Sequence, residues 1–320
     1  MALSARQKVW CNAMKKSIFS NKFTAVLVAM VVSMLWGTLF PAIKIGYRVF
    51  GIDSTQVAAI LLFAGVRFLI SGVILVGADR VRRKGVCLPT RKQFGSIFAV
   101  SMLTVVLHYA FTYSGLSLAE SSKSSVLKQI AFLVVPAIVC FFRKDDRFSM
   151  RKLFAAMLGF MAVLAVSMDG TSFRLGAGEI LIILASFSSM FGNLVSKNVY
   201  DKEDPVYIVA YGQLFGGIVL VAVGLLFGGR IGHISWESIG VLAYICAASI
   251  TANLLWNTLI KYNDMSRLAV LKSMDPLFAS LFSALLLREN IWKITYLVAV
   301  VLVICAVTVS NYAGKKAVKQ

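Results

Sequence analysis

The chain has 320 residues, of which 59% are hydrophobic and 15% are charged, and its mean hydropathy is +0.81. Soluble domains carry about 25% charged residues, so this apolar excess has no soluble core to fill and lipid must be the solvent. Polar stretches stay below about 25 residues, which leaves no room for a sizeable soluble domain.

The formal net charge is +19, from 33 Lys and Arg against 14 Asp and Glu. In a soluble protein such a charge would suggest a nucleic-acid partner. Here the positive residues fall in the links between apolar stretches, which is typical of loops on one side of a membrane. We therefore expect a lipid bilayer, and no nucleic acid, as partner.

Apolar stretches of about 20 residues, each long enough to span a bilayer, recur along the chain between short polar links. They predict an all-α polytopic membrane protein with ten transmembrane helices, near residues 24–47, 56–77, 94–115, 120–142, 152–169, 177–197, 205–228, 237–260, 264–287 and 292–312. The first apolar run is too long for a signal peptide and has no small-residue cleavage site after it, so we interpret it as an uncleaved helix.

The distribution of Lys and Arg predicts the orientation of these helices. With the N-terminus inside, the inner segments hold roughly 23 Lys and Arg and the outer segments roughly 6. An even number of helices then puts both termini in the cytoplasm. We expect a multi-pass protein of the plasma membrane with a basic cytoplasmic N-terminus (1–23) and a cytoplasmic tail (314–320).

The chain contains an internal repeat that carries polar residues with it. Residues 122–128 read SKSSVLK, and residues 266–272, which lie 144 positions later, read SRLAVLK. In the same register Tyr109 and Tyr113 align with Asn253 and Asn257. The repeat predicts two homologous halves, 24–172 and 173–313, of five helices each, and because five is odd the halves must be inverted relative to each other.

Four cations lie within the predicted helices: Lys44, Arg67, Lys128 and Lys272. A charge at the centre of a membrane helix costs about 2.5–3.5 kcal/mol on insertion scales, so each needs an explanation. Lys128 and Lys272 each lie about 12 Å into their helix from opposite sides, which predicts two positive groups around a central site for an anion or a carboxylate-bearing zwitterion. The alternatives are snorkelling to the surface or pairing with an acid.

An acid partner is available to only one of these two lysines. Asp275 follows Lys272 by three residues on the same helical face, whereas Ala131 holds that position after Lys128. Snorkelling explains Lys44, which is near the outer end of its helix. Arg67 lies deeper and cannot lose its proton, so it serves either substrate binding or a structural hydrogen-bond network.

A polar stripe accompanies the lysines. His108, Tyr109, Thr112 and Tyr113 share one helix face, and the second half repeats that face with Asn253, Trp256 and Asn257. Hydroxyls, amides and an indole beside a cation suit a polar organic solute. Interhelical hydrogen bonding is the alternative for any single residue, and His108 could serve as a proton relay or as a structural group.

Motifs for catalysis and cofactor binding are missing from the sequence. The five cysteines are scattered without metal-ligand spacing, and there is no P-loop, HExxH or nucleophile elbow. We expect no metal, no cofactor and no enzyme activity. Transport driven by ATP is not expected of this chain alone.

Three segments resemble a known family. Residues 35–44 (LWGTLFPAIK), 64–70 (AGVRFLI) and 274–289 (MDPLFASLFSALLLRE) resemble the EamA family of the drug/metabolite transporter superfamily. The resemblance covers about residues 24 to 312. It implies a ten-helix carrier with two inverted repeats, a central cavity, and export or exchange of small metabolites. Phe132 and Asp145 depart from the family pattern where Pro276 and Glu289 follow it in the second half.

The sequence therefore predicts a secondary transporter of a small polar metabolite, an amino acid or another organic anion, by alternating access. The residues predicted to contact substrate are Lys128, Lys272, Tyr109, Tyr113, Asn253, Trp256, Asn257 and Trp36, with His108, Arg67 and Asp275 as relay or structural groups. Three alternatives stay open: an exchanger of phosphorylated solutes or nucleotide-sugar-like anions, a membrane-embedded lipid-modifying enzyme, and a membrane scaffold. A homodimer also stays open.

Overall fold

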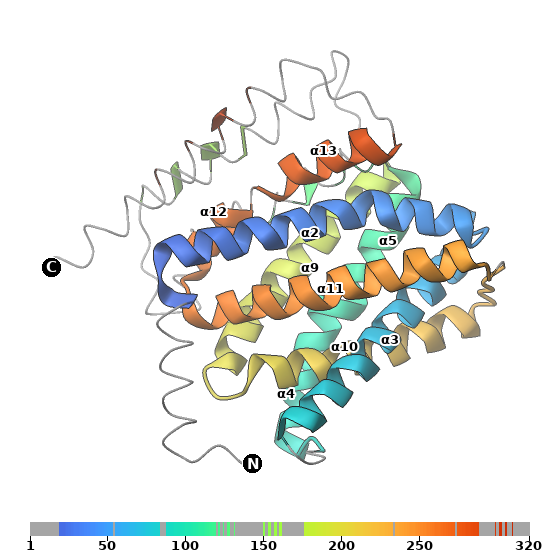
Figure 1. The fold of residues 1–320 in the computed structure, drawn as a ribbon, viewed down its shortest axis with the longest axis horizontal. Helices are drawn as coiled ribbons and strands as arrows, with labels where there is room; N and C mark the ends of the chain where they lie inside the picture. Colours follow the sequence, from blue (N-terminus) through green and yellow to red (C-terminus); the bar gives the residue numbers. More distant parts are fainter. Residues whose placement is uncertain are drawn as a thin grey trace, which may run out of the picture.

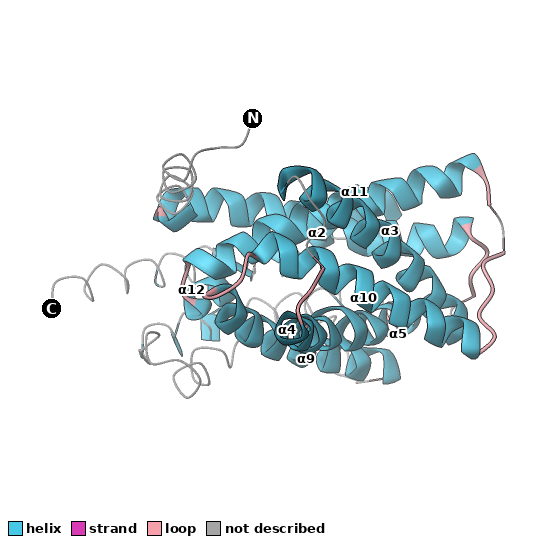
Figure 2. Cartoon of the chain, turned by 90° about the horizontal axis from the view of Figure 1, so that it is seen from below, coloured by secondary structure: helices cyan, strands magenta, loops and turns pink. Residues whose placement is uncertain are grey.

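The structure is a computed structural model, and it describes two long blocks of the chain. These are residues 19–119, apart from 54 and 84–87, and residues 176–287, apart from 233 and 273, with isolated positions between 121 and 161 and after 297. Within these residues the chain consists of helices and loops alone (Figure 2).

Figure 1 shows the helices coloured along the sequence, from blue at the N-terminus to red at the C-terminus. They are α2 (Lys22–Val49), α3 (Val57–Arg83), α4 (Arg91–Ser101), the π-helix η1 (Met102–Leu107), α5 (His108–Leu118), α9 (Ala177–Tyr200), α10 (Pro205–Leu226), α11 (Trp236–Tyr262), α12 (Met265–Lys272) and α13 (Asp275–Leu287). The segments α4, η1 and α5 form one continuous helix, Arg91–Leu118.

Seven helices within the described residues are long and apolar enough to cross a membrane. They coincide with the predicted spans near 24–47, 56–77, 94–115, 177–197, 205–228, 237–260 and 264–287. The predicted spans 120–142, 152–169 and 292–312 fall largely outside the described residues, as do the N-terminal residues 1–18 and the tail 314–320. The protein is a multi-pass membrane protein.

Several helices begin where a side chain satisfies the free backbone N–H groups of the first turn. Asn21 accepts a hydrogen bond from the backbone of Phe23 at 2.9 Å. Thr90 and Gln93 form a capping box, which starts α4 three residues before the predicted start at 94. The helix α3 continues to Arg83, past the predicted end at 77, because its last turn lies beyond the apolar run and carries three arginines, which favour a helix C-terminus.

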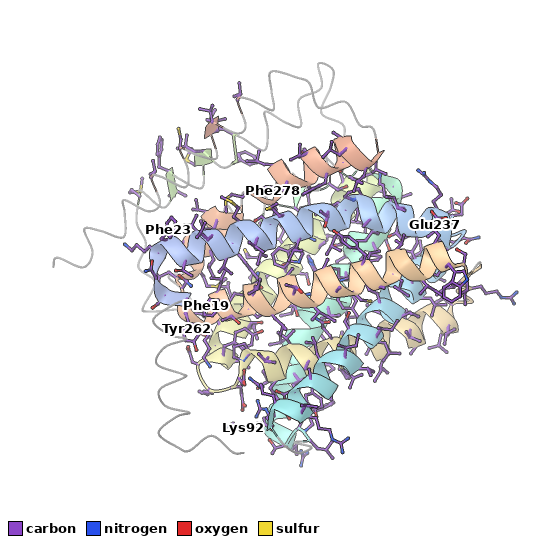
Figure 3. All side chains as sticks on the ribbon, viewed as in Figure 1. Phe19, Phe23, Lys92, Glu237, Tyr262 and Phe278 are labelled. Atoms are coloured by element: carbon purple, nitrogen blue, oxygen red, sulfur yellow. The ribbon has the colours of Figure 1, made fainter. Side chains whose placement is uncertain are left out.

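Helices α3 and α10 pack closely, and their backbones meet at glycines. A Cβ atom on Gly72 of α3 would lie 2.4 Å from the backbone nitrogen of Leu214, and one on Gly217 of α10 would lie 2.4 Å from that of Leu69. Small residues allow membrane helices to approach closely and gain van der Waals contact. A similar contact at Gly37 brings α2 against Phe278 of α13 (Figure 3).

Hydrogen bonds tie together one end of the bundle, which we call the basic end. It contains the starts of α2, α4, α10 and α12 and the ends of α3, α9 and α11, and its cations include Arg82, Arg83, Lys92, Lys202, Lys261 and Arg267. Phe19 and Tyr262, which stack with ring centres 6.4 Å apart, lie at this end, and Glu237 lies at the other (Figure 3).

Ion pairs join α3 to the start of α10 at the basic end. Arg82 contacts Asp79 and reaches Asp204 at 2.6 Å, and Arg83 also contacts both carboxylates. Burial opposes ionisation of Asp204, but the hydrogen bond and charge of Arg82 outweigh it and lower the pKa of this carboxyl. Asp204 is also the N-cap of α10, so one carboxylate serves both contacts.

Candidate functional site

A cavity lies inside the bundle and is lined by residues of α2, α3, α4, η1, α5, α9, α10 and α11, by the last residue of α12 and the first of α13, and by Lys128. Of the residues singled out from the sequence, the lining includes Trp36, Arg67, His108, Tyr109, Lys128, Asn253, Trp256, Asn257, Lys272 and Asp275. Tyr113 is the exception. The structure thus brings ten scattered sequence positions to one cavity.

Lys272 ends α12 and is neutralised at short range. Its ammonium lies 2.6 Å from the carboxylate of Asp275, the first residue of α13. The same ammonium lies 3.1 Å from the ring centre of Trp36 and 4.8 Å from that of Trp256. Ser33 of α2 donates a further hydrogen bond to Asp275 at 2.5 Å. The pairing predicted from the three-residue spacing is therefore present, and both charges are buried.

Lys128, the repeat-related lysine, has different surroundings. It is half-buried, and its ammonium lies 5.3 Å from the ring centre of Phe40 and 5.6 Å from that of Tyr109. Its backbone carbonyl accepts a hydrogen bond of 2.5 Å from Ser186 of α9, and the same hydroxyl accepts one from the backbone N–H of Ala131. Among the described residues, no carboxylate forms an ion pair with Lys128.

Arg67 of α3 is fully buried in an aromatic environment. Its guanidinium lies 4.1 Å from the ring centre of Phe68 and 5.1 Å from that of Tyr109, and Nη1 donates to the hydroxyl of Tyr113. Its Nε and Nη2 atoms have no hydrogen-bond partner among the described residues. An unsatisfied buried donor costs about 1–3 kcal/mol, so the guanidinium favours a nearby negative charge.

Tyr113 is hydrogen-bonded to Arg67 and is not among the lining residues of the cavity. The ring is fully buried, its hydroxyl accepts from Arg67, and its backbone carbonyl accepts a 3.1 Å hydrogen bond from Tyr47. The helix face predicted from spacing is therefore divided: Tyr109 faces the cavity and Tyr113 packs beside it. A helix face spans a wide arc, and neighbouring helices decide which part of the arc meets the cavity.

His108 and Tyr109 directly follow the π-helix η1. Nδ1 of His108 lies 2.8 Å from the carbonyl oxygen of Ala185. Since a carbonyl can only accept, Nδ1 carries the hydrogen and Nε2 is left to act as an acceptor when the ring is neutral. π-helical turns often occur at functional sites because they shift the register of the residues that follow.

The polar residues of α11 contact α9. Asn257 accepts a 2.6 Å hydrogen bond from the hydroxyl of Tyr200, and its amide donates to the carbonyl of Asn253 one turn earlier. Trp256 meets Trp36 edge to face, with ring centres 5.4 Å apart. These residues form the wall of the cavity next to Lys272.

The sequence interpretation overlooked several polar residues of the cavity. They are Thr104, Ser189, Asn193, Tyr200 and Gln213. Asn193 and Gln213 are isolated amides in apolar helices, and polar groups inside membrane helices mark functional sites by default. Oε1 of Gln213 has no partner among the described residues. Their position in apolar runs was the signal that could have identified them.

The composition of the lining is typical of a site that binds a small organic ligand. Within the described residues there is no group of three His, Cys, Asp or Glu that could hold a metal ion. Asp275 is the only acidic residue among those found to line the cavity. The lining combines ring faces, amides and hydroxyls with cations, which is the usual composition of a site for a small organic ligand.

The chain is similar in sequence to known membrane transporters. The sequence model of the EamA-like transporter family matches the chain twice, over residues 23–168 and 176–312. The uncharacterized transporter YvbV of Bacillus subtilis (strain 168) is 26% identical over 92% of this chain and 94% of its own length. The S-adenosylmethionine/S-adenosylhomocysteine transporter of Chlamydia muridarum (strain MoPn / Nigg) is 24% identical over 85% of this chain and 88% of its own.

The fold also matches that of a solved crystal structure. The two superpose with a TM-score of 0.71 at 17% sequence identity, over 90% of this chain and 98% of the other. At that identity the likeness concerns the fold alone. The two family matches together span most of the chain, and this chain belongs to the EamA-like transporter family of membrane transporters.

Proposed function

We propose that this transporter is a secondary carrier that exports or exchanges a small polar metabolite, an amino acid or another organic anion, by alternating access at the cavity. The observation that carries the proposal is Lys128, a half-buried cation that lines the cavity without an acid partner among the described residues. A charge inside a membrane protein is expensive and is retained for function by default.

The proposed architecture is ten helices in two inverted halves, 24–172 and 173–313. The two matches of one family model, to 23–168 and 176–312, support the duplication. The repeat-related Lys128 and Lys272 both line the cavity, as expected of a site at the interface between repeats. Alternating access would then arise from rocking one half against the other.

The proposed location is the plasma membrane. In the proposed orientation the basic end faces the cytoplasm. Arg82, Arg83, Lys92, Lys202 and Arg267 support this orientation, because cytoplasmic segments carry an excess of Lys and Arg. The basic N-terminal residues 1–23 and the tail 314–320 would lie on the same side. A homodimer is compatible with this arrangement.

The proposed roles follow from position in the cavity. Lys128 attracts the negative group of the solute, and Tyr109 and His108 lie beside it on α5. Asn253, Asn257, Trp256 and Trp36 form another part of the lining and offer amide and indole contacts. Lys272, Asp275 and Arg67 set the charge of the site, and Tyr113 acts through Arg67.

The alternative within the same class is an exchanger of phosphorylated solutes. The cations of the cavity would suit phosphate as well as carboxylate. The relative that is named as an S-adenosylmethionine/S-adenosylhomocysteine transporter extends the candidates to sulfonium and nucleoside solutes. At 24% identity that name is a reason to include these solutes in the assay.

The test is counterflow in proteoliposomes with pools of labelled amino acids, organic acids, phosphate esters and S-adenosyl compounds. Wild type would be compared with Lys128→Gln and with the control Lys92→Gln, which removes an exposed charge at the start of α4. We expect one class of solute to be transported by wild type and by the control. The flux of that class should fall at least tenfold in Lys128→Gln. Equal flux in all three proteins would refute the role of Lys128, and no flux of any pool would refute carriage of these solutes.

A further inference from the structure

The two repeat-related lysines of the cavity differ in their electrostatic state. The ammonium of Lys272 is 2.6 Å from Asp275, so this pair contributes little net charge to the cavity. Lys128 has no such partner among the described residues, because Ala131 occupies the position that corresponds to Asp275. Among the described residues, Lys272 is therefore neutralised by an acid and Lys128 is not. We call the surroundings of Lys272 the neutral pole and those of Lys128 the positive pole.

Arg67 strengthens the positive pole. Its guanidinium and the ammonium of Lys128 lie on the same ring, 5.1 Å and 5.6 Å from the centre of Tyr109, so the two cations are within about 11 Å of each other. Two of the donor atoms of Arg67 are buried and have no hydrogen-bond partner in the part of the chain that the structure describes. Arg67 therefore acts on a solute through its charge, across Tyr109, while Lys128 is the group that a solute can reach.

When Arg67, Lys128, Lys272 and Asp275 are all ionised, their charges sum to +2 in the described lining of the cavity. Two like charges within about 11 Å of each other repel by about 1.5 kcal/mol or more at an effective dielectric constant near 20, and an anion between or beside them relieves the repulsion. A zwitterion with equal and opposite charges offers no net compensation. The neutral pole, walled by Trp36 and Trp256, offers ring faces to the remainder of the solute.

We propose that the cavity selects solutes with net negative charge over neutral or zwitterionic solutes, and that their anionic group binds at Lys128 beside Tyr109. This inference rests on the proposed transport function and narrows its substrate class. The charge of Lys272 is already compensated by Asp275 at 2.6 Å, so Lys128 is the stronger attractor of the anionic group. The anionic group is a carboxylate or a phosphate, which both accept hydrogen bonds from an ammonium.

The test uses three probes of nearly the same shape and graded charge: succinate, succinamate and succinamide. Purified protein in detergent would be titrated with each at pH 6.5, and the thermal unfolding midpoint followed, because a ligand that binds only the folded state raises it. We expect succinate to raise the unfolding midpoint at a concentration at least tenfold below the concentration of succinamide that gives the same rise. Succinamate should be intermediate. Glycerol 3-phosphate against glycerol would show whether phosphate replaces carboxylate.

Two pairs of variants assign the effect to Lys128. Lys128→Gln should abolish the preference for succinate, whereas Lys92→Gln should retain it. Ala131→Asp would supply the acid that Lys128 lacks and should abolish the preference, whereas Ala131→Asn, with the same shape and no charge, should retain it. Equal responses to the three probes, including no response to any, would overturn the proposal, as would a preference that survives Lys128→Gln.

Counterflow of labelled succinate and alanine separates this inference from the transport function. If succinate stabilises the protein but no solute moves, the anion site stands and the transport proposal fails. If alanine moves equally in wild type and Lys128→Gln and succinate does not compete, transport stands and the selection of anions is refuted.

Discussion

Lys272 and Asp275 form an ion pair of 2.6 Å between the end of α12 and the start of α13, with side chains that are 10% and 7% exposed. The pair satisfies two charges that would otherwise be expensive inside the bundle. Trp36 adds a ring face at 3.1 Å from the ammonium, and a desolvated cation over a ring gains about 2 kcal/mol. The contact also holds α2 against α12 and α13.

Removal of either partner of this pair should destabilise the protein more than removal of both. We expect Lys272→Met or Asp275→Leu to lower the free energy of unfolding by about 3–5 kcal/mol, because each leaves a buried charge without its partner. The double variant should recover most of that loss, since an apolar pair has no charge to desolvate. Unfolding of the purified protein by SDS titration would measure this, and a double variant as unstable as the single ones would contradict it.

The contact between α3 and α10 should not tolerate a side chain at Gly72. A Cβ there would lie 2.4 Å from the backbone nitrogen of Leu214, so Gly72→Ala must separate the helices and should cost about 1–3 kcal/mol of stability. Gly77→Ala is the control on the same helix, because nothing lies within 4 Å of its Cβ position. It should be neutral or stabilising by about 0.5–1 kcal/mol. Equal effects of the two variants would refute the close approach.

Lys197 should stabilise the junction between α11 and α12. Its ammonium is buried and donates to the carbonyls of Ile260 at 2.8 Å and Asn263 at 2.7 Å, at the C-terminal end of α11. Hydrogen bonds to a charged group contribute about 1.5–3 kcal/mol, and we expect Lys197→Met to lose that much. It should also speed amide hydrogen exchange at the end of α11. The exposed Lys202→Met should change neither quantity.

The ion pairs of Asp204 should make stability depend on acid pH. The pKa of this carboxyl is lowered in the folded protein from its ordinary value of 3.8, because Arg82 outweighs the effect of burial. A lowered pKa contributes stability that is fully present above pH about 4 and is lost as the pH falls through the folded pKa. Asp204→Asn keeps an N-cap side chain and should flatten this part of the pH profile of the unfolding midpoint. An unchanged profile would refute the assignment to Asp204.

The positions of the helices followed from the sequence to a large extent. Apolar runs of membrane length predicted seven of the spans that the structure describes, because every backbone group in lipid must be satisfied within a helix. Contacts between residues close together in the sequence could also be predicted. The spacing of Lys272 and Asp275 predicted their ion pair, since side chains three residues apart share a helix face.

The tertiary structure decided which faces meet. Tyr113 packs behind Arg67 although it shares the predicted face with Tyr109, and Asn193 and Gln213 line the cavity without a motif to announce them. Lys197 finds its partners more than 60 residues away. The register of residues within one helix is a property of the chain, whereas the approach of two helices depends on every side chain between them. The sequence by itself therefore determined the membrane class, the repeated lysines and the acid that is available to Lys272, and only the packing of the helices decided that both lysines line one cavity.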